Sequence, residues 1–180
     1  MNSRGDLFNN ERVAPRSPKL LKVLEIGVNH AMKYNEDWHS RLPKTVKGNL
    51  LRNKHYIFFG AEYLGECFGS AIWTTPVANN RMSKGYVWLE LRRLAIPDDA
   101  PKFTATFMIA KMIKAIKKKY PEITRLVSYQ DTEVHAGTIY AAANWKLDNI
   151  SKFQEWNGEN RERKNELQSK ADKIRWIYQL

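Results

Sequence analysis

The chain has 180 residues, 43% of them hydrophobic, so it can bury one core without needing disulfides or metal ions. Its formal net charge of +11 favours polyanionic partners such as nucleic acid, an anionic membrane surface or a phosphate-rich cofactor. A single cysteine excludes a disulfide framework, and the lack of an apolar leader or of any apolar run of about 18 residues predicts a cytoplasmic protein without a membrane span.

The first part of the chain is expected to be an arm followed by a helix. Residues 1–16 are polar, which predicts a loose arm ahead of a single domain over residues 17–180. Ser17 followed by Pro18 is typical of a helix start, because the hydroxyl caps the first turn and proline suits its first position. Apolar residues at helical spacing then predict a helix that runs to about residue 34.

A basic connecting segment follows over residues 38–53, where Pro43 and Gly48 interrupt any regular pattern. No acid balances its charge between residues 38 and 56, which favours phosphate contacts over an ordinary solvated surface. The basic side chains expected to contact DNA are Arg41, Lys44, Lys47, Arg52 and Lys54. One of Trp38, Tyr56 and Tyr63 is expected to hold a base that has been displaced from the DNA stack.

Three strands are expected in the middle of the chain. Alternating, aromatic-rich stretches predict strands over residues 55–61 and 64–74, joined by a short turn near Glu62. A longer central strand is expected over residues 86–96. Cys67 lies in the second strand, where a buried spectator thiol is the expected role.

The clearest helix is predicted over residues 102–119, before Pro121. Six apolar residues recur at helical spacing and form its expected buried stripe: Ala105, Met108, Ile109, Met112, Ile113 and Ile116. Lysines occupy the opposite side, which we interpret as a solvated face: Lys111, Lys114, Lys117 and Lys118.

The remaining elements complete a sheet. A short buried strand is expected over residues 123–129, a helix over 135–143, and further strands over 145–150 and 174–180, with a charged surface excursion between them. This alternation predicts one α/β domain with a central, mostly antiparallel mixed sheet flanked by helices.

Polar residues gather where the 123–129 strand ends. Asp131 follows that strand, and Tyr140 lies in the next helix. Ligands often bind at the end of a buried strand in an α/β sheet, and a helix N-terminus there attracts anions. Asp131 suits a turn or a helix cap as well as catalysis, and Tyr140 suits core packing as well as a role in the site. His39, in the basic segment, suits either chemistry or phosphate contact.

Several segments together resemble known proteins. Ile139-Tyr140 and Asn144-Trp145, within 137–145, resemble the last helix motif of the GNAT acetyltransferase fold. The wider pattern closely resembles the phage Mom family of DNA-modifying proteins. It comprises residues 38–43, 90–96, the lysine-rich helix, 127–131, 137–145 and 178–180.

This resemblance implies a GNAT-like domain that modifies adenine in DNA at its exocyclic amino group. The adduct would be of a carbamoylmethyl type and would shield phage DNA from host restriction nucleases. His39, Asp131 and Tyr140 would form the active centre, with Tyr140 as the acid towards the departing thiolate of coenzyme A and Arg93 helping to hold the donor. An iron ion held by His39, Asp131 and a third ligand is a further implication.

The turn over residues 96–104 departs from the GNAT pattern. GNAT proteins cradle the donor pyrophosphate with a glycine-rich turn, because glycine permits close approach of the backbone. Here the turn has no glycine, and it contains Asp98 and Asp99, which repel phosphate. Lys102, Thr104 and the helix N-terminus remain the expected anion site, for acetyl-CoA or another activated acyl donor.

These expectations share one arrangement. The end of the 123–129 strand and the Tyr140 hydroxyl should open onto a common cleft that residues 38–53 border. Two other functions stay open. An ordinary acetyltransferase would act on a protein or small-molecule amine, whereas a non-catalytic module on the same fold would bind DNA or RNA through its charge alone.

Overall fold

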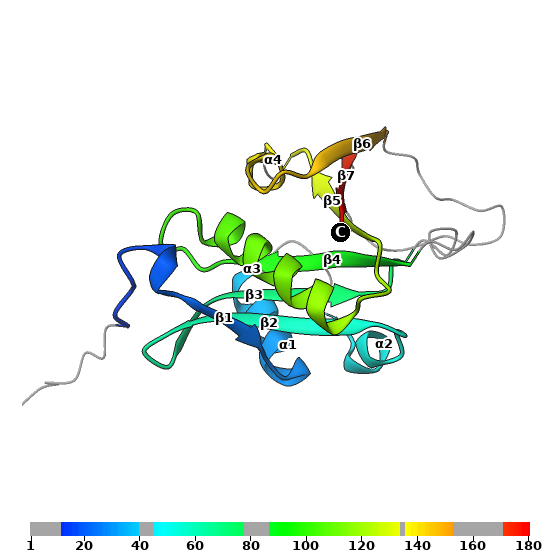
Figure 1. The fold of residues 1–180 in the computed structure, drawn as a ribbon. Coiled ribbons are helices and arrows are strands. Elements are labelled where there is room, and N and C mark those ends of the chain that lie inside the picture. The colour runs from blue at the N-terminus through cyan, green and yellow to red at the C-terminus, as the bar shows by residue number, and fades with distance from the viewer. Residues whose placement is uncertain (1–11, 40–44, 78–86, 134–135, 153–170) are drawn as a thin grey trace, which may run out of the picture.

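The computed structural model describes residues 12–39, 45–77, 87–133, 136–152 and 171–180. A seven-stranded sheet forms the centre of the fold (Figure 1). The strands are β1 (Lys22–Glu25), β2 (Tyr56–Tyr63), β3 (Glu66–Thr74), β4 (Trp88–Ala95), β5 (Arg125–Asp131), β6 (Lys146–Ser151) and β7 (Lys173–Gln179). The helices are η1 (Pro18–Leu20), α1 (Val28–Trp38), α2 (Lys47–Leu51), α3 (Thr104–Lys119) and α4 (Thr138–Ala142).

The strand order is β1-β2-β3-β4-β5-β7-β6. Among the described strands, only β4 and β5 pair in parallel, and α3 provides the crossover between them. All other neighbours pair antiparallel. The expected α/β fold with a mostly antiparallel mixed sheet is therefore confirmed.

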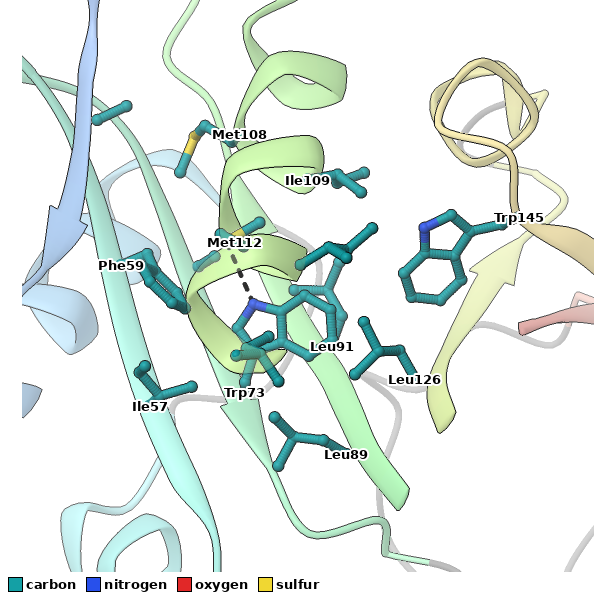
Figure 2. Close-up of a cluster of buried hydrophobic side chains, with 14 of the residues drawn as sticks. Ile57, Phe59, Trp73, Leu89, Leu91, Met108, Ile109, Met112, Leu126 and Trp145 are labelled. Carbon is teal, nitrogen blue, oxygen red and sulfur yellow. Dashed lines mark hydrogen bonds between the residues drawn. The ribbon is translucent and has the colours of Figure 1, made fainter. Parts of the chain in front are cut away.

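Helices α1 and α3 cover opposite faces of the sheet. The expected buried stripe of α3 packs against Trp73 and Leu89, with Ala105 at its half-buried margin. Trp73 Nε1 lies 3.2 Å from the sulfur of Met112, a contact that Figure 2 marks with a dashed line. On the other face, Ala31 of α1 packs with Ile72 of β3. We call these the α3 face and the α1 face.

The predicted helix over residues 17–34 is wrong in its first half. Ser17 caps only the short turn η1, and residues 22–25 form the edge strand β1, which pairs antiparallel with β2. Its apolar residues fit both helical and strand spacing, and pairing with β2 decides the outcome. Helix α1 starts after Gly27 and continues to Trp38.

Three smaller features also differ from expectation. Within the segment expected to be irregular, α2 forms and buries Leu50. The β2–β3 turn lies at Leu64 and Gly65, which both have positive φ, as a two-residue hairpin turn requires. In the expected arm, Pro15 is buried, while Arg12 donates to the Cys67 carbonyl and pairs with Asp99 at 3.2 Å.

No helix in the described ranges is long and apolar enough to cross a membrane.

Strands β4 and β5 are paired along only part of their length. Their pairing runs from Trp88 opposite Arg125 to Leu91 opposite Ser128. Beyond that point β4 continues beside β3, and β5 continues beside β7 to Asp131. The two strands therefore part from each other, and we call the end of the sheet where they do so the site end.

Candidate active site

Tyr140 lies where β4 and β5 part. Its hydroxyl oxygen is 2.9 Å from the hydroxyl oxygen of Ser128, and Ser128 donates to the carbonyl of Leu91 at 3.1 Å. A serine hydroxyl carries one proton, so while Ser128 donates that proton to Leu91, Tyr140 is the donor in its bond to Ser128. Leu91 and Ser128 are the last paired residues of the two strands, which places the Tyr140 hydroxyl beside the parting.

Two tryptophans enclose the Tyr140 ring. Trp176 of β7 stacks on it with 5.6 Å between ring centroids, and Trp145 lies tilted at the same separation. Trp176 donates from Nε1 to Gln130 Oε1 at 2.7 Å, which ties its orientation to β5. Figure 2 shows Trp145 pointing toward the buried cluster around Leu91.

Tyr140 is only 5% exposed, so the prediction that its hydroxyl opens onto a cleft is wrong for this structure. Two tryptophan rings and the Ser128 hydroxyl surround the Tyr140 side chain, which explains its burial. Burial raises the pKa of Tyr140, and its hydrogen bond with Ser128 works against that rise.

The motif over residues 137–145 holds Tyr140 in place by ending helix α4. Asn144 has a φ of 62°, and its amide donates to the carbonyl of Ala141. The Trp145 amide donates to the carbonyl of Tyr140 at 3.0 Å, and their rings touch. These two bonds and the ring contact are the Schellman motif, in which asparagine suits the left-handed position.

Gly137 begins α4 at a position where no other residue fits easily. Its φ is 73°, and an added Cβ would overlap the side chain of Gln130 and approach Trp176 to 3.0 Å. The glycine therefore lets the start of α4 lie directly on the Gln130–Trp176 pair.

Asp131 lies at the end of β5 on the α1 face. Side chains alternate along a strand, so Asp131 points away from the face on which Ser128 meets Tyr140. Its carboxylate accepts a hydrogen bond from the Glu133 amide at 3.0 Å, the turn role that the sequence left open beside catalysis. The structure therefore separates Asp131 and Tyr140 onto two sides of one strand.

Arg93 lies on the α1 face of β4, opposite Ile72 of β3. The strand is bulged between its pairings at Leu91 and Arg93, and Arg92 is the extra residue. Arg93 donates to the carbonyl of Arg92 at 2.8 Å, while its Nε is buried without a hydrogen-bond partner among the described residues. Burial and the neighbouring Arg92 lower the pKa of Arg93.

Trp38 and His39 end α1 near the site end. Trp38 stacks on Tyr34 with 4.8 Å between ring centroids, and the Arg12 guanidinium lies 5.7 Å from its ring. The His39 amide donates to the carbonyl of Asn35. The Trp38 indole, a candidate for holding a displaced base, is therefore already in contact with Tyr34 and Arg12.

The basic segment does not border the site as a unit. Arg41 and Lys44 lie outside the described residues. Lys47, Arg52 and Lys54 lie in or after α2, which precedes the start of β2 at the opposite end of the sheet (Figure 1). The expectation that residues 38–53 border the cleft is wrong for Lys47 and Arg52, because α2 packs Leu50 beside Phe58.

The β4–α3 turn takes an unusual form without glycine. Phe103 adopts a φ of 69° and leaves its ring 77% exposed. Asp99 is paired with Arg12, which offsets one of the two acids expected to repel phosphate. Thr104 is buried and its hydroxyl donates to the carbonyl of Pro101 at 2.7 Å, so that proton is not presented to an anion, whereas Lys102 is exposed.

An iron site does not fit the described residues. No three His, Cys, Asp or Glu side chains gather there as a set that could hold a metal ion. His39 and Asp131 therefore lack a third ligand within the described ranges, and His135 lies outside them.

Sequence reasoning missed three residues that act on Tyr140. Ser128, Gln130 and Trp176 contact it or support its neighbours through hydrogen bonds and stacking. Ser128 and Gln130 alternate on the β5 face that bears Leu126, and this spacing was the available signal.

Known structures share this fold. An acetyltransferase of the GNAT family from Elizabethkingia anophelis, solved with acetyl-CoA bound, is 13% identical with a TM-score of 0.58, and the match covers 89% of this chain and 99% of that one. The Escherichia coli ribosomal-protein-S18-alanine N-acetyltransferase is 10% identical with a TM-score of 0.59, covering 88% and 93%. The spermidine/spermine N-acetyltransferase of Vibrio cholerae, in complex with manganese ions, is 10% identical with a TM-score of 0.62, covering 90% and 94%.

The GNAT-like fold expected from the sequence is thereby confirmed. No curated protein sequence matches the chain. The family model of the Mom protein family, however, matches residues 23–178, which include every described strand except the first residue of β1 and the last of β7. The chain belongs to the Mom protein family.

Proposed function

We propose that this protein is a transferase that adds a small acyl-derived group to the exocyclic amino group of adenine in DNA. The observation that carries the proposal is the parting of β4 and β5 beside Tyr140 in a chain of the Mom family. The adduct is of the carbamoylmethyl type that the family resemblance implies, and its role is protection of phage DNA from host restriction.

The parting gives the two substrates separate approaches. Ser128 and Tyr140 face the α3 side of β5, whereas Asp131 and Arg93 face the α1 side. We assign the donor to the α3 side and adenine to the α1 side, because the two sides meet where β4 and β5 are no longer paired. This assignment makes the separation of Asp131 from Tyr140 a requirement of the reaction.

The residues present fit an acyl-CoA donor. The edges of β4 and β5 are unpaired with each other past Leu91 and Ser128, which suits the insertion of an extended chain. Phe103 supplies the left-handed turn that glycine usually provides, and Arg12 offsets Asp99 near the start of α3. Bound there, coenzyme A would supply the activated acyl group and a thiolate leaving group. The Elizabethkingia relative of this fold was solved with acetyl-CoA.

The chain's own residues would then manage two protons. The new bond forms between the adenine amino nitrogen and a carbon of the donor while the bond from that carbon to the leaving-group sulfur breaks, so the nitrogen loses a proton and the sulfur gains one. Asp131, on the adenine side, orients the amine or takes its proton. Tyr140, on the donor side, gives its proton to the leaving group, which must reach the buried hydroxyl through the parting of β4 and β5. Arg93 is proposed to donate a hydrogen bond at the parting, and its buried Nε–H supports this role.

DNA binding is proposed from charge and from a surface that extends along the sheet. Lys47, Arg52 and Lys54 lie one strand length from the site end, about 26 Å for the eight residues of β2. A duplex of about eight base pairs spans that length, so these side chains can contact phosphates while a displaced base reaches the site. Trp38 and His39 lie at the site end on α1.

Nucleoside mass spectrometry of DNA from cells that produce the protein tests the proposal. A modified adenosine nucleoside is expected from the wild-type protein, and none from Asp131→Ala or Tyr140→Phe. Both variants should still bind DNA, because neither residue is assigned to the phosphate contacts. Equal loss of binding in both variants would refute the assigned roles.

The same experiment separates the rival functions. An acetylated protein or polyamine without modified adenosine would identify an ordinary acetyltransferase, the activity named for two of the proteins that share this fold. Tight, salt-dependent DNA or RNA binding without any product would identify a non-catalytic module.

A further inference from the structure

The direction of hydrogen bonding at Tyr140 is set by its neighbours. Ser128 Oγ donates to the carbonyl of Leu91, which can only accept. The Tyr140 hydroxyl is therefore the donor to Ser128 at 2.9 Å. In this arrangement the phenol proton points at Ser128, so a role for Tyr140 as an acid requires this hydrogen-bond chain to change direction.

Serine can make that change by rotating a single bond. We propose that Ser128 is a positioning residue that accepts the Tyr140 proton at rest and then turns its own hydroxyl from Leu91 to the phenolate oxygen. The proposal rests on the proposed function, in which Tyr140 gives its proton to a thiolate. The O–H bond of Tyr140 breaks, an S–H bond forms on the leaving group, and the negative charge stays on the Tyr140 oxygen.

Ser128 itself exchanges no atoms in this step. Only its O–H direction changes, and the Leu91 carbonyl loses one hydrogen bond while the phenolate gains one. A charge-assisted hydrogen bond is about twice as strong as a neutral one, so the exchange favours the phenolate over the carbonyl. Ser128 is 2% exposed, which keeps water from taking its place.

The other groups around Tyr140 are poorly suited to this role. Trp145 and Trp176 present their rings to it, and Trp176 donates its N–H to Gln130. Tyr178 of β7 is a titratable side chain in the same aromatic group, with its ring against Trp145. From α3, the side chains of the shared buried cluster are apolar. Among these described groups, Ser128 is the one whose hydroxyl lies within hydrogen-bond distance of the phenol.

Ser128→Ala is the decisive variant, with Ser128→Cys and Ser128→Thr as matched comparisons. Alanine removes the donor, cysteine keeps a weak one, and threonine keeps the hydroxyl with one added methyl group. Thermal unfolding of each variant checks that it folds. The Tyr140 titration is followed by fluorine NMR on protein made with 3-fluorotyrosine, because fluorine lowers the phenol pKa and so brings the titration to less alkaline pH. The Tyr140 resonance is identified by its loss in Tyr140→Phe.

We expect the Tyr140 titration midpoint to move to higher pH in Ser128→Ala, to move less in Ser128→Cys and to stay near wild type in Ser128→Thr. A midpoint that is unchanged or lower in Ser128→Ala overturns the proposal. In enzyme assays, the alkaline limb of the kcat profile should follow the midpoint, while KM for DNA is unchanged.

The two proposals fail separately. A shifted titration in a protein that never modifies DNA would retain the coupling of Ser128 to Tyr140 and reject the proposed function. An active enzyme whose titration and kcat profile ignore Ser128→Ala would retain the function and reject the role of Ser128.

Discussion

Ser128 and Asp131 point to opposite faces of strand β5. Ser128 meets the Tyr140 hydroxyl on the α3 face, and Asp131 bonds to the Glu133 amide on the α1 face. Three residues apart on a strand, two side chains must differ in face, so this separation follows from the strand itself. A reaction with both residues therefore needs two substrates that approach from opposite sides and meet where β4 no longer covers the edge of β5.

Tyr140→Phe should make stability less sensitive to alkaline pH. Burial raises the pKa of Tyr140 above its ordinary value of 10.0. Above pH 10 the unfolded chain loses this proton while the folded chain keeps it, so wild-type stability falls as pH rises toward the raised pKa. Below pH 10 both states keep the proton and the group contributes nothing to the pH dependence.

Urea unfolding at pH 7 and just above pH 10 measures this effect. At pH 7, Tyr140→Phe should cost about 1 kcal/mol for the lost hydrogen bond to Ser128. Between pH 7 and the alkaline pH, the free energy of unfolding should fall less in Tyr140→Phe than in the wild type. Tyr56→Phe, which removes a hydroxyl from a 37% exposed residue, is the control and should keep the wild-type loss. Identical pH dependence in all three proteins would contradict the assignment.

Gly137→Ala should destabilise the fold and disturb Tyr140. The new Cβ would overlap Gln130 and come within 3.0 Å of Trp176, at a φ of 73° that alanine disfavours. The strain alone costs about 1–3 kcal/mol, and the overlap adds to it. Urea unfolding gives the loss, and tryptophan fluorescence reports the environment of Trp176.

Gly48→Ala is the matched control for that variant. Gly48 lies in helix α2, and a Cβ there meets nothing within 4 Å. Alanine should therefore be neutral or stabilise by up to about 1 kcal/mol, because glycine weakens helices. Equal losses in the two variants would show that the close approach at Gly137 is not what matters.

The sequence predicts an element correctly where its apolar residues fit helical spacing alone. The prediction is wrong where the apolar residues fit both helical and strand spacing. The α3 stripe at Met108, Met112 and Ile116 is long and purely helical in spacing, and it is buried as expected. Residues 22–25 are a short apolar run that suits helix or strand, and only the edge of β2 makes them a strand. That pairing partner lies more than 30 residues away along the chain, so local spacing carries no record of it.

The candidate site was located by sequence, but its internal geometry was not. Asp131 and Tyr140 were placed correctly at a strand end and in the next helix. Their separation depends on the register of β5 against β4 and β7, which brings Ser128 opposite both Leu91 and Trp176. Register is a property of the assembled sheet, so neither the partner of Tyr140 nor its burial could be inferred from the motif.

Phe103→Gly should be more stable than Phe103→Ala. Phe103 has a φ of 69°, which costs a residue with a side chain about 1–2 kcal/mol and costs glycine little. Both variants remove the exposed ring equally, so their difference isolates the backbone. We expect glycine to exceed alanine by about 1 kcal/mol in urea unfolding, after its greater chain entropy is counted. Equal stability would mean that the turn relaxes without strain.

DNA binding should depend on the basic residues at the α2 end of the sheet. The triple variant Lys47→Gln, Arg52→Gln and Lys54→Gln removes three positive charges there. If each contacts one phosphate, the slope of log K against log salt should fall by about 2.7, at about 0.9 per contact. Fluorescence anisotropy with a labelled duplex at several salt concentrations measures the slope.

Lys114→Gln, Lys117→Gln and Lys118→Gln together form the matched control, because they remove the same charge from α3 on the opposite face. We expect the lysine face of α3 to be solvated and not to contact DNA. The slope of log K against log salt for this triple variant should therefore stay near wild type. If net charge alone controls binding, the slopes of the two triple variants should fall equally. That outcome would remove the α2 end from the proposed DNA surface. A fall confined to the α3 triple would instead place the duplex on the α3 face, where the proposed function puts the donor.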